Sequence, residues 1–351
     1  FLSVRMLVVL CINLYATRVL LTNLGVDDYG IYNVVCGFVS MVMFINTSLT
    51  NGIQRFYNYE LGRNGGIGLP KVYSTAVLIQ IIVVVLALLL TETVGLWYLN
   101  NKMVIPPEKL SAVRYIYQFS VLSFIVVILQ SPYSAAVIAY ERMDYYAIVS
   151  ILVNAMKLIA AIVLPLAGTE RLLNYSILLL VVSALEFLMY YLYVKVKFKA
   201  IRWTSISDFS TFKSMCSFSG WNIFGSFSNL MKEQGVNLIL NLFCVPAANA
   251  ARAIAVQVNG GIQSFINNFT IPIRPQVIKS YASGDIDRTM SLTYTISKFS
   301  CFFLYALALP LIAEIDFILN IWIGKDVPEY TAEADAVGTL RLLEAVRICG
   351  L

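Results

Sequence analysis

Long apolar runs constrain this chain more than any other feature of its sequence. Runs of about 20 mostly apolar residues recur along the chain, and each is long enough for an α-helix to cross a bilayer. Hydrophobic residues make up 59% of the 351 positions and charged residues 13%. Soluble domains carry about 25% charged residues. The sequence therefore predicts an all-α, polytopic membrane bundle and excludes a soluble enzyme, a secreted disulfide scaffold and a nucleic-acid binder.

We expect nine membrane-spanning helices joined by short polar connections, none of which is large enough to form a domain. The predicted spans are 2–24, 29–54, 72–98, 112–139, 144–166, 172–194, 215–244, 248–273 and 289–312. Lys and Arg residues gather in alternate connections, twelve in one set and four in the other. The positive-inside rule then places the N-terminus in the cytoplasm. Because the chain starts at Phe1 inside an apolar run, we expect it to be a fragment.

The sequence lacks the residues that several kinds of chemistry require. The chain contains no histidine, which excludes histidine-based catalysis, metal binding and pH switching. The six cysteines are scattered without a CxxC pair, and we interpret them as small buried hydrophobes rather than disulfides or metal ligands. No P-loop, catalytic loop constellation or pore-loop motif is present. The sequence predicts neither an enzyme nor a bound cofactor or metal.

Charged side chains inside spans are candidates for function, because each costs about 2.5–3.5 kcal/mol at a helix centre. Lys157 and Glu186 lie in the middle of adjacent spans, and we predict a structural ion pair between them. Arg18 lies near the outer end of the first span, where it either snorkels to head groups or faces a cavity. Arg55 and Arg274 end two spans on the inner side, where they serve as anchors or as ligands.

The seventh span contains the polar sequence Lys232-Glu233-Gln234-Gly235. The apolar run after it, 236–243, is too short to cross a bilayer, so the polar cluster lies within the span. Gly235 weakens the helix there. This pattern is typical of discontinuous helices at transport sites. The alternative is a Lys232–Glu233 pair that satisfies itself against another helix.

A set of motifs resembles a known family of transporters. The motifs are Arg18-Val-Leu-Leu-Thr-Asn-Leu-Gly-Val-Asp-Asp-Tyr-Gly-Ile-Tyr32, Gln54-Arg55-Phe56, Glu60-Leu-Gly62, Glu92-Thr-Val-Gly-Leu-Trp97, Pro132-Tyr133, Glu141-Arg142-Met143, Asn249-Ala-Ala-Arg252 and Arg274-Pro-Gln276. They are similar, in order over residues 1–328, to motifs of the Wzx-type oligosaccharide flippases. That family belongs to the MOP (multidrug/oligosaccharidyl-lipid/polysaccharide) exporter superfamily.

The resemblance implies a MOP/MATE-like transporter with two helical bundles around a cationic cavity. Family members move undecaprenyl-pyrophosphate-linked oligosaccharide across the bacterial inner membrane by alternating access. By position, the cavity arginines of the family fall on Arg18, Arg55 and Arg252, and we expect Arg274 and Lys232 to join them. Membrane lipids and the polysaccharide polymerase and ligase machinery are the implied partners. A multidrug or lipid II exporter, or a membrane glycan polymerase or ligase, remains the alternative.

The same comparison predicts three regions. Residues 1–200 would form a six-helix N-terminal bundle, and 201–328 about three helices of a second bundle, so that the family's later helices are missing. Residues 329–351 carry a charge every few positions and read as a soluble amphipathic tail. This tail resembles a fragment of GDP-mannose 4,6-dehydratase, and the string Pro328-Glu-Tyr-Thr331 occurs in both families. We therefore expect a chimeric junction, with a tail too short to bind a nucleotide.

Overall fold

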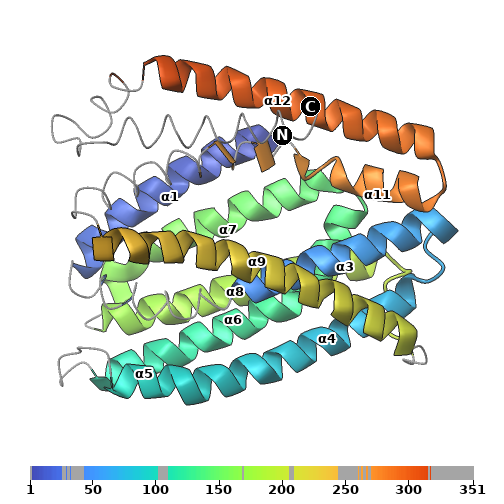
Figure 1. Ribbon diagram of the computed structural model, residues 1–351. Coiled ribbons are helices and arrows are strands. Elements are labelled where there is room, and N and C mark those ends of the chain that lie inside the picture. Colours follow the sequence, from blue (N-terminus) through green and yellow to red (C-terminus); the bar gives the residue numbers. More distant parts are fainter. Residues whose placement is uncertain are drawn as a thin grey trace. The chain divides into compact units, whose positions relative to one another are not determined.

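The computed structural model describes residues 2–25, 43–101, 110–167, 170–204, 209–243 and 270–314, together with positions 29, 32, 260, 262, 263, 266, 267 and 317. Within these residues the regular structure is helical and no strand occurs (Figure 1). The predicted all-α class is therefore confirmed. Three predictions lie outside the described residues: the conformation of the tail 329–351, the placement of Arg252, and most of the predicted span 248–273.

The described part of the chain contains ten α-helices, several of which are joined by short connections. In chain order they are α1 (Leu2–Leu24), α3 (Met43–Asn64), α4 (Leu69–Leu90), α5 (Leu96–Asn101), α6 (Leu110–Ala139), α7 (Met143–Val163), α8 (Arg171–Lys197), α9 (Phe209–Phe243), α11 (Arg274–Ala282) and α12 (Ile286–Ala313). A π-helical stretch, Thr91–Gly95, joins α4 to α5 without a break. Gly65 and Gly66, both with positive φ, turn the chain from α3 into α4, where a side chain would strain the backbone.

Six of the described helical segments are long and apolar enough to cross a membrane. They are Val4–Leu24, Leu69–Asn101, Ala112–Ala139, Met143–Val163, Arg171–Lys197 and Ile286–Pro310. Six of the predicted spans coincide with them. Helices α3 and α9 overlap two further predicted spans but are too polar to meet the same criterion. Helix α3 also runs on to Asn64, ten residues past the predicted end of its span.

The chain divides into two compact units, Phe1–Phe224 and Gly225–Leu351. The boundary lies within α9, beyond the predicted boundary at residue 200. The first half of α9 belongs with the N-terminal unit because it packs on α3, where a Cβ on Gly52 would lie 2.7 Å from Ser219 Oγ. In the C-terminal unit, α11 and α12 are joined by a short turn, and the Asp285 carboxylate caps α12 by accepting a hydrogen bond from Arg288 N.

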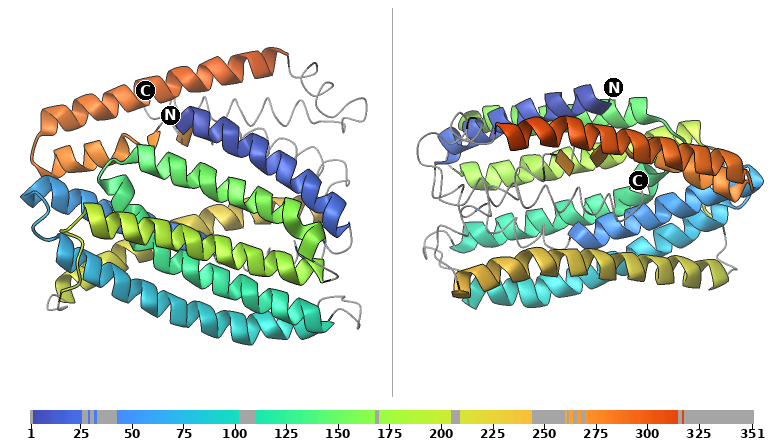
Figure 2. Two further views of the ribbon diagram at one scale, coloured as in Figure 1. Left: turned by 180° about the vertical axis from the view of Figure 1, so that it is seen from behind. Right: turned by 45° about the horizontal axis from the view of Figure 1, so that its top comes forward.

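Helix α6 is the central element of the N-terminal unit. It packs against α3, α4, α7 and α8, while α1 packs along α7, as Figure 2 shows. The core contains buried tyrosines as well as aliphatic residues, and the hydroxyl groups of Tyr73 and Tyr133 are hydrogen-bonded at 2.9 Å. Such a bond offsets the cost of burying the two hydroxyl groups, whereas the hydroxyl of the buried Tyr57 in the same core has no partner among the described residues.

Two local predictions were wrong. Helix α9 is a continuous α-helix from Phe209 to Phe243 and is not interrupted at Gly235, since one glycine weakens a helix without preventing its hydrogen bonds. Among the described cysteines, Cys11 and Cys216 are exposed free thiols rather than buried groups, because they lie on the outward faces of α1 and α9.

Candidate functional site

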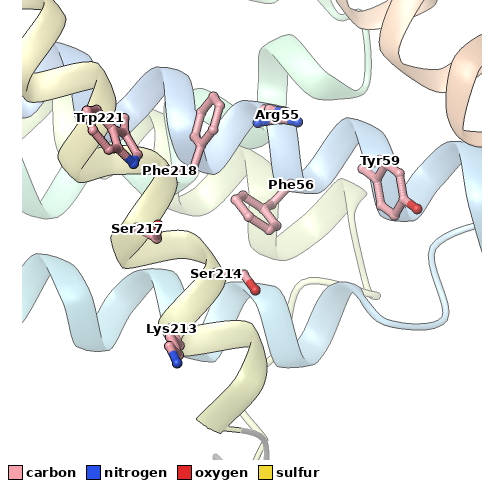
Figure 3. A pocket seen from close by; sticks show the side chains of 8 residues that line it. All are labelled: Arg55, Phe56, Tyr59, Lys213, Ser214, Ser217, Phe218 and Trp221. Atoms are coloured by element: carbon pink, nitrogen blue, oxygen red, sulfur yellow. The ribbon is translucent and has the colours of Figure 1, made fainter.

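A cavity of about 670 Å³ opens between α3 and the first half of α9, entirely within the N-terminal unit (Figure 3). Helix α3 contributes Arg55, Phe56 and Tyr59. Helix α9 contributes Lys213, Ser214, Ser217, Phe218 and Trp221. The two helices that line this cavity are the two that are too polar to count as membrane spans by composition.

Helical periodicity brings these side chains to one wall. On α9, Lys213, Ser217 and Trp221 are spaced by four residues, so they stack along one face. Ser214 and Phe218 are also four residues apart, and each follows directly after Lys213 or Ser217 in the helix. Figure 3 shows Lys213 nearest the start of α9 and Trp221 furthest along it, with the serines between them.

On α3, the pocket face lies beside a buried polar face. Arg55 and Tyr59 are exposed to the cavity and are four residues apart. Gln54 and Asn58, each one position earlier, point into the bundle and are buried. The side-chain amide of Asn58 has no hydrogen-bond partner in the described part of the chain. Helix α3 therefore presents polar groups both to the cavity and to the interior of the unit.

Two cations define the electrostatics of the pocket. The Arg55 guanidinium carbon lies 4.0 Å from the centroid of the Phe218 ring, in a cation–π contact. A cation–π contact of this kind does not use up the N–H donors of the guanidinium for hydrogen bonding. The structure gives neither Arg55 nor Lys213 a hydrogen-bond or ion-pair partner among the described residues, and no lining residue is acidic. The pocket is therefore suited to an anion.

Aromatic rings form much of the remaining wall. Phe56 packs edge-on against Phe218, with the ring centroids 6.2 Å apart. Trp221 is 74% exposed and Tyr59 37% exposed, so both offer open ring surface. Rings of this kind supply broad apolar contact area, and Tyr and Trp add a polar group at the edge. The arrangement can hold a ligand that combines a strongly anionic group with flat, partly apolar surfaces.

The structure brings only one of the predicted cavity residues to this pocket. Arg55 lines it, whereas Arg18 is exposed on α1 and does not line it. Arg274 is exposed at the first position of α11, in the C-terminal unit. Lys232 lies within α9, but its side chain is outside the described residues, as is the whole of Arg252. Their predicted place in a shared cavity stays a prediction.

The sequence reasoning missed Lys213, Phe218 and Trp221 as ligands. In the sequence, Lys213 is one of the twelve basic residues of the connections that the positive-inside rule places in the cytoplasm. The signal that could have found it is the four-residue repeat of Lys213, Ser217 and Trp221 at the start of a helix with unusual polarity. The aromatic partner of Arg55 could not have been found, because it comes from a helix more than 150 positions away in the chain.

The predicted ion pair between Lys157 and Glu186 is not formed in this structure. Glu186 Oε1 instead accepts a hydrogen bond from Gln130 Nε2 of α6, at 3.0 Å, and Lys157 is exposed. The reason is the register of α7 and α8, in which Tyr145 packs against Tyr190. Four residues further along each antiparallel helix, Glu186 is level with position 149, about two helical turns from Lys157.

A second intramembrane cation, Arg5, also escaped the sequence reasoning. It lies near the start of α1, donates from Nη1 to Ser150 Oγ at 3.2 Å and sits over the Tyr146 ring at 5.1 Å. Both partners belong to α7, so Arg5 ties α1 to α7. Clusters of three or more Cys, Asp or Glu residues that could hold a metal are not found in the described part of the chain.

Comparisons with known proteins give two separate results. No family model matches the sequence. A short segment is similar to GDP-mannose 4,6-dehydratases: the protein of Sinorhizobium fredii is 59% identical over 32 residues, which are 9% of this chain and 9% of that protein. The Drosophila melanogaster protein is 40% identical over 68 residues, 19% of this chain and 15% of its own length. These matches confirm that a fragment resembles the dehydratase and cover too little of it to carry over its activity.

The solved structures that resemble the chain are membrane transporters. A MATE in the bent conformation matches with a TM-score of 0.79 and 8% identity, over 96% of this chain and 75% of that one. The Vibrio cholerae MATE transporter VcmN in its bent form matches with a TM-score of 0.74 and 14% identity, over 94% and 76%. An outward-facing multidrug resistance MATE transporter of the MOP superfamily matches with a TM-score of 0.74 and 8% identity, over 96% and 76%. The chain is a multi-pass membrane protein with the fold of the MATE transporters of the MOP superfamily.

Proposed function

We propose that this protein is a flippase that moves undecaprenyl-pyrophosphate-linked oligosaccharide across the bacterial inner membrane by alternating access. The observation that carries the proposal is the pair of cations, Arg55 and Lys213, on the aromatic-lined wall of the α3/α9 cavity, neither of which has an acidic partner among the described residues. The transporter fold and the motifs that resemble Wzx-type flippases support the same assignment. We further propose that the delivered glycan passes to polysaccharide polymerase and ligase machinery.

The pyrophosphate is the part of such a substrate that most needs the protein. It carries negative charges, and the idealised cost of moving one ion into a low-dielectric medium is of order 20 kcal/mol. A cavity within the bundle that presents a guanidinium and an ammonium replaces the lost hydration with charge-assisted hydrogen bonds. The in-plane donors of Arg55 match phosphate oxygens in pairs, and Lys213 adds a mobile point charge.

The aromatic wall suits the neighbouring sugar units. Trp221, Tyr59 and Phe218 provide flat surfaces against which pyranose rings can lie with their C–H faces. Ser214 and Ser217 are placed to exchange hydrogen bonds with sugar hydroxyls or phosphate oxygens. The polyprenyl chain needs no pocket, because it can remain in the lipid while the head group moves.

The test is a flipping assay in proteoliposomes. The probe is a polyprenyl-pyrophosphate-linked oligosaccharide with a fluorescent tag, and the readout is the tag's transfer to the leaflet that a membrane-impermeant quencher reaches. We expect Arg55→Gln and Lys213→Gln each to reduce the transfer rate at least tenfold. The matched control is Arg63→Gln, which removes an exposed arginine from the last turn of α3, outside the pocket. Equal rates in Arg55→Gln, Lys213→Gln and the control would exclude this pocket as the substrate site.

Multidrug export is the second candidate, because one structural neighbour is a multidrug resistance transporter. The charge of the pocket distinguishes multidrug export from the flipping of an anionic lipid. A pocket without an acidic lining residue disfavours cationic drugs, so we expect proteoliposomes to transport the anionic lipid probe and not a cationic dye. Transport of the dye with no transport of the lipid probe would favour the drug exporter.

A further inference from the structure

The chain carries a concentration of basic residues where α8 ends and the connection to α9 begins. Lys195, Lys197, Lys199 and Arg202 are all exposed, and no acidic residue lies between them in the sequence. We call residues 195–203 the basic connection. The apolar helix that precedes it is a candidate membrane span that ends at Lys197. The four cations therefore lie where the chain leaves the hydrocarbon region of the bilayer.

Inward-facing residues hold the basic connection in a defined shape. Phe198 is buried and stacks on the Tyr140 ring, with the ring centroids 4.0 Å apart. Ile201 is 3% exposed and belongs to the core of the N-terminal unit. Directly after the connection, Thr204 N donates to Ser74 Oγ at 2.8 Å. Because the backbone is fixed at these points, Lys199 and the other cations between them are presented from an ordered surface.

The same contacts place the basic connection at the level of the membrane boundary. Tyr140 follows directly after α6, and Ser74 lies in the second turn of α4. The candidate spans of α4 and α6 begin and end at these points. Trp203, which is 56% exposed, is therefore at the depth that tryptophan favours in membrane proteins, with its ring toward lipid and its N–H toward head groups.

The cations of the basic connection are not neutralised by carboxylates in the described part of the chain. The structure gives Lys197, Lys199 and Arg202 neither an ion pair nor a hydrogen bond from their side chains among the residues that it describes. On the adjoining turn between α6 and α7, Asp144 forms an ion pair with Arg142 at 3.2 Å. The connection is therefore a surface of one sign that is complementary to an anion.

An aliphatic surface continues from the cations along α8. Leu185, Leu188, Leu192 and Val196 are spaced by three, four and four residues, so they lie on one face of the helix, and all four are exposed. We call them the aliphatic stripe. A soluble anion could use only the cations, whereas a ligand with an anionic head and hydrocarbon chains can use both surfaces at once. Position and chemistry together favour a lipid.

We propose that the basic connection and the aliphatic stripe form a binding site for an anionic phospholipid of the surrounding bilayer, such as phosphatidylglycerol. Lys199 and Arg202 bind the phosphate by charge-assisted hydrogen bonds, and an acyl chain lies along the stripe. Because the connection also contacts α4 and the end of α6, the bound lipid stabilises this end of the N-terminal unit. This lipid remains in the bilayer, so the proposal makes no assumption about the substrate of the α3/α9 pocket.

The experiment uses Trp203 as the reporter of its own surroundings. The variant Trp97→Phe/Trp221→Phe/Trp322→Phe leaves Trp203 as the one tryptophan of the chain. It is reconstituted in vesicles of phosphatidylcholine with a minor share of phosphatidylglycerol, and one of the two lipids carries bromines, which quench tryptophan fluorescence, on its acyl chains. At equal content of brominated lipid, we expect phosphatidylglycerol to quench as if enriched about fivefold or more around Trp203, since each basic residue near an anionic lipid contributes about this factor.

The test variant and its control remove the same charge from the same end of the unit. Lys199→Gln/Arg202→Gln, made in the Trp203 reporter, should lose most of the preference for phosphatidylglycerol. Arg63→Gln/Lys71→Gln removes two exposed cations from the last turn of α3 and the first turn of α4, and should keep it. The preference should also fall as salt is raised from 0.1 to 1 M, because the Debye length shrinks from about 10 to 3 Å.

A second measurement uses the chain with all its tryptophans, in case the reporter variant folds poorly. Added phosphatidylglycerol should raise the unfolding temperature in detergent more than phosphatidylcholine does, in the wild type and in Arg63→Gln/Lys71→Gln but not in Lys199→Gln/Arg202→Gln. The proposal is overturned if the two lipids quench Trp203 and stabilise the wild type equally. It is also overturned if the control loses the preference as fully as Lys199→Gln/Arg202→Gln, because the effect would then belong to the general charge of this end.

Discussion

Arg55 on α3 lies over the ring of Phe218 on α9, with 4.0 Å between the guanidinium carbon and the ring centroid (Figure 3). This contact joins two polar helices at the wall of the cavity and holds the cation of Arg55 against the ring. It also ties the first half of α9 to the N-terminal unit.

Replacing Phe218 by leucine should weaken anion binding without removing a charge. A cation–π contact at an exposed site is worth about 0.5–1 kcal/mol, which corresponds to a roughly two- to fivefold rise in Kd. The measurement is binding of a pyrophosphate-bearing polyprenyl lipid to the purified protein. Phe302→Leu, at an exposed position of α12, is the control for loss of an aromatic ring. If the two variants bind equally well, the ring of Phe218 does not position Arg55.

Gly52→Ala should destabilise the contact between α3 and α9. The added Cβ would lie 2.7 Å from the buried Ser219 Oγ, so the Ser219 side chain must rotate or the two helices must move apart. Overpacking of this kind costs about 1–3 kcal/mol. Thermal unfolding in detergent measures it, and Gly220→Ala, which meets nothing within 4 Å, is the control. The double variant Gly52→Ala/Ser219→Gly should recover part of the loss. If the double variant recovers no stability, the strain in Gly52→Ala does not come from the contact with Ser219.

Tyr117→Phe should destabilise the π-helical stretch. The Tyr117 hydroxyl donates to the carbonyl oxygen of Thr91 at 2.7 Å in a buried position, where the change from α4 to the π turn begins. Without this donor the Thr91 carbonyl keeps only the backbone hydrogen bond from Leu96 N, so the loss should cost about 0.5–1.5 kcal/mol. Tyr115→Phe removes the same hydroxyl from a 61% exposed position of the same helix and should be nearly neutral. Equal unfolding temperatures for the two variants would contradict the prediction.

Lys157 and Glu186 should behave as independent residues. Because they lie about two helical turns apart and Glu186 bonds to Gln130, the effects of Lys157→Met and Glu186→Met on stability should add within about 0.5 kcal/mol. A structural ion pair predicts the opposite, namely that the double variant is more stable than either single one. Unfolding of the three variants distinguishes these outcomes. If the double variant is more stable than the sum of the two single effects by about 1 kcal/mol or more, Lys157 and Glu186 do form an ion pair.

Much of the helical organisation could be read from the sequence. The predicted spans 2–24, 112–139 and 172–194 coincide with α1, α6 and α8 to within a few residues. The reason is that a membrane span must be long, apolar and internally hydrogen-bonded, so the pattern alone identifies it. Pro275 lies in the first turn of α11, where proline is favoured, and α6 continues through Pro132.

The partners of individual side chains could not be read in this way. The sequence placed Arg55 at the end of a polar span, but its ring partner comes from α9. The sequence also placed Glu186 at mid-span, yet only the register of α6, α7 and α8 gives it Gln130 in place of Lys157. Contacts between helices depend on how each helix is rotated about its axis and on the register between neighbouring helices, to within half a turn. The hydropathy of the sequence carries no information on either.

The sequence by itself determined that this protein is a bundle of membrane helices with costly charges at a few known depths. Apolar length and the price of burying a charge are local properties, so they can be read from the chain alone. Only the tertiary structure decided which helices pair, and therefore that α3 and α9 enclose a cationic, aromatic cavity and that α6 gives Glu186 its amide partner. The physical reason is that a pocket and a hydrogen bond exist only between surfaces, and the packing of the helices chooses which surfaces meet.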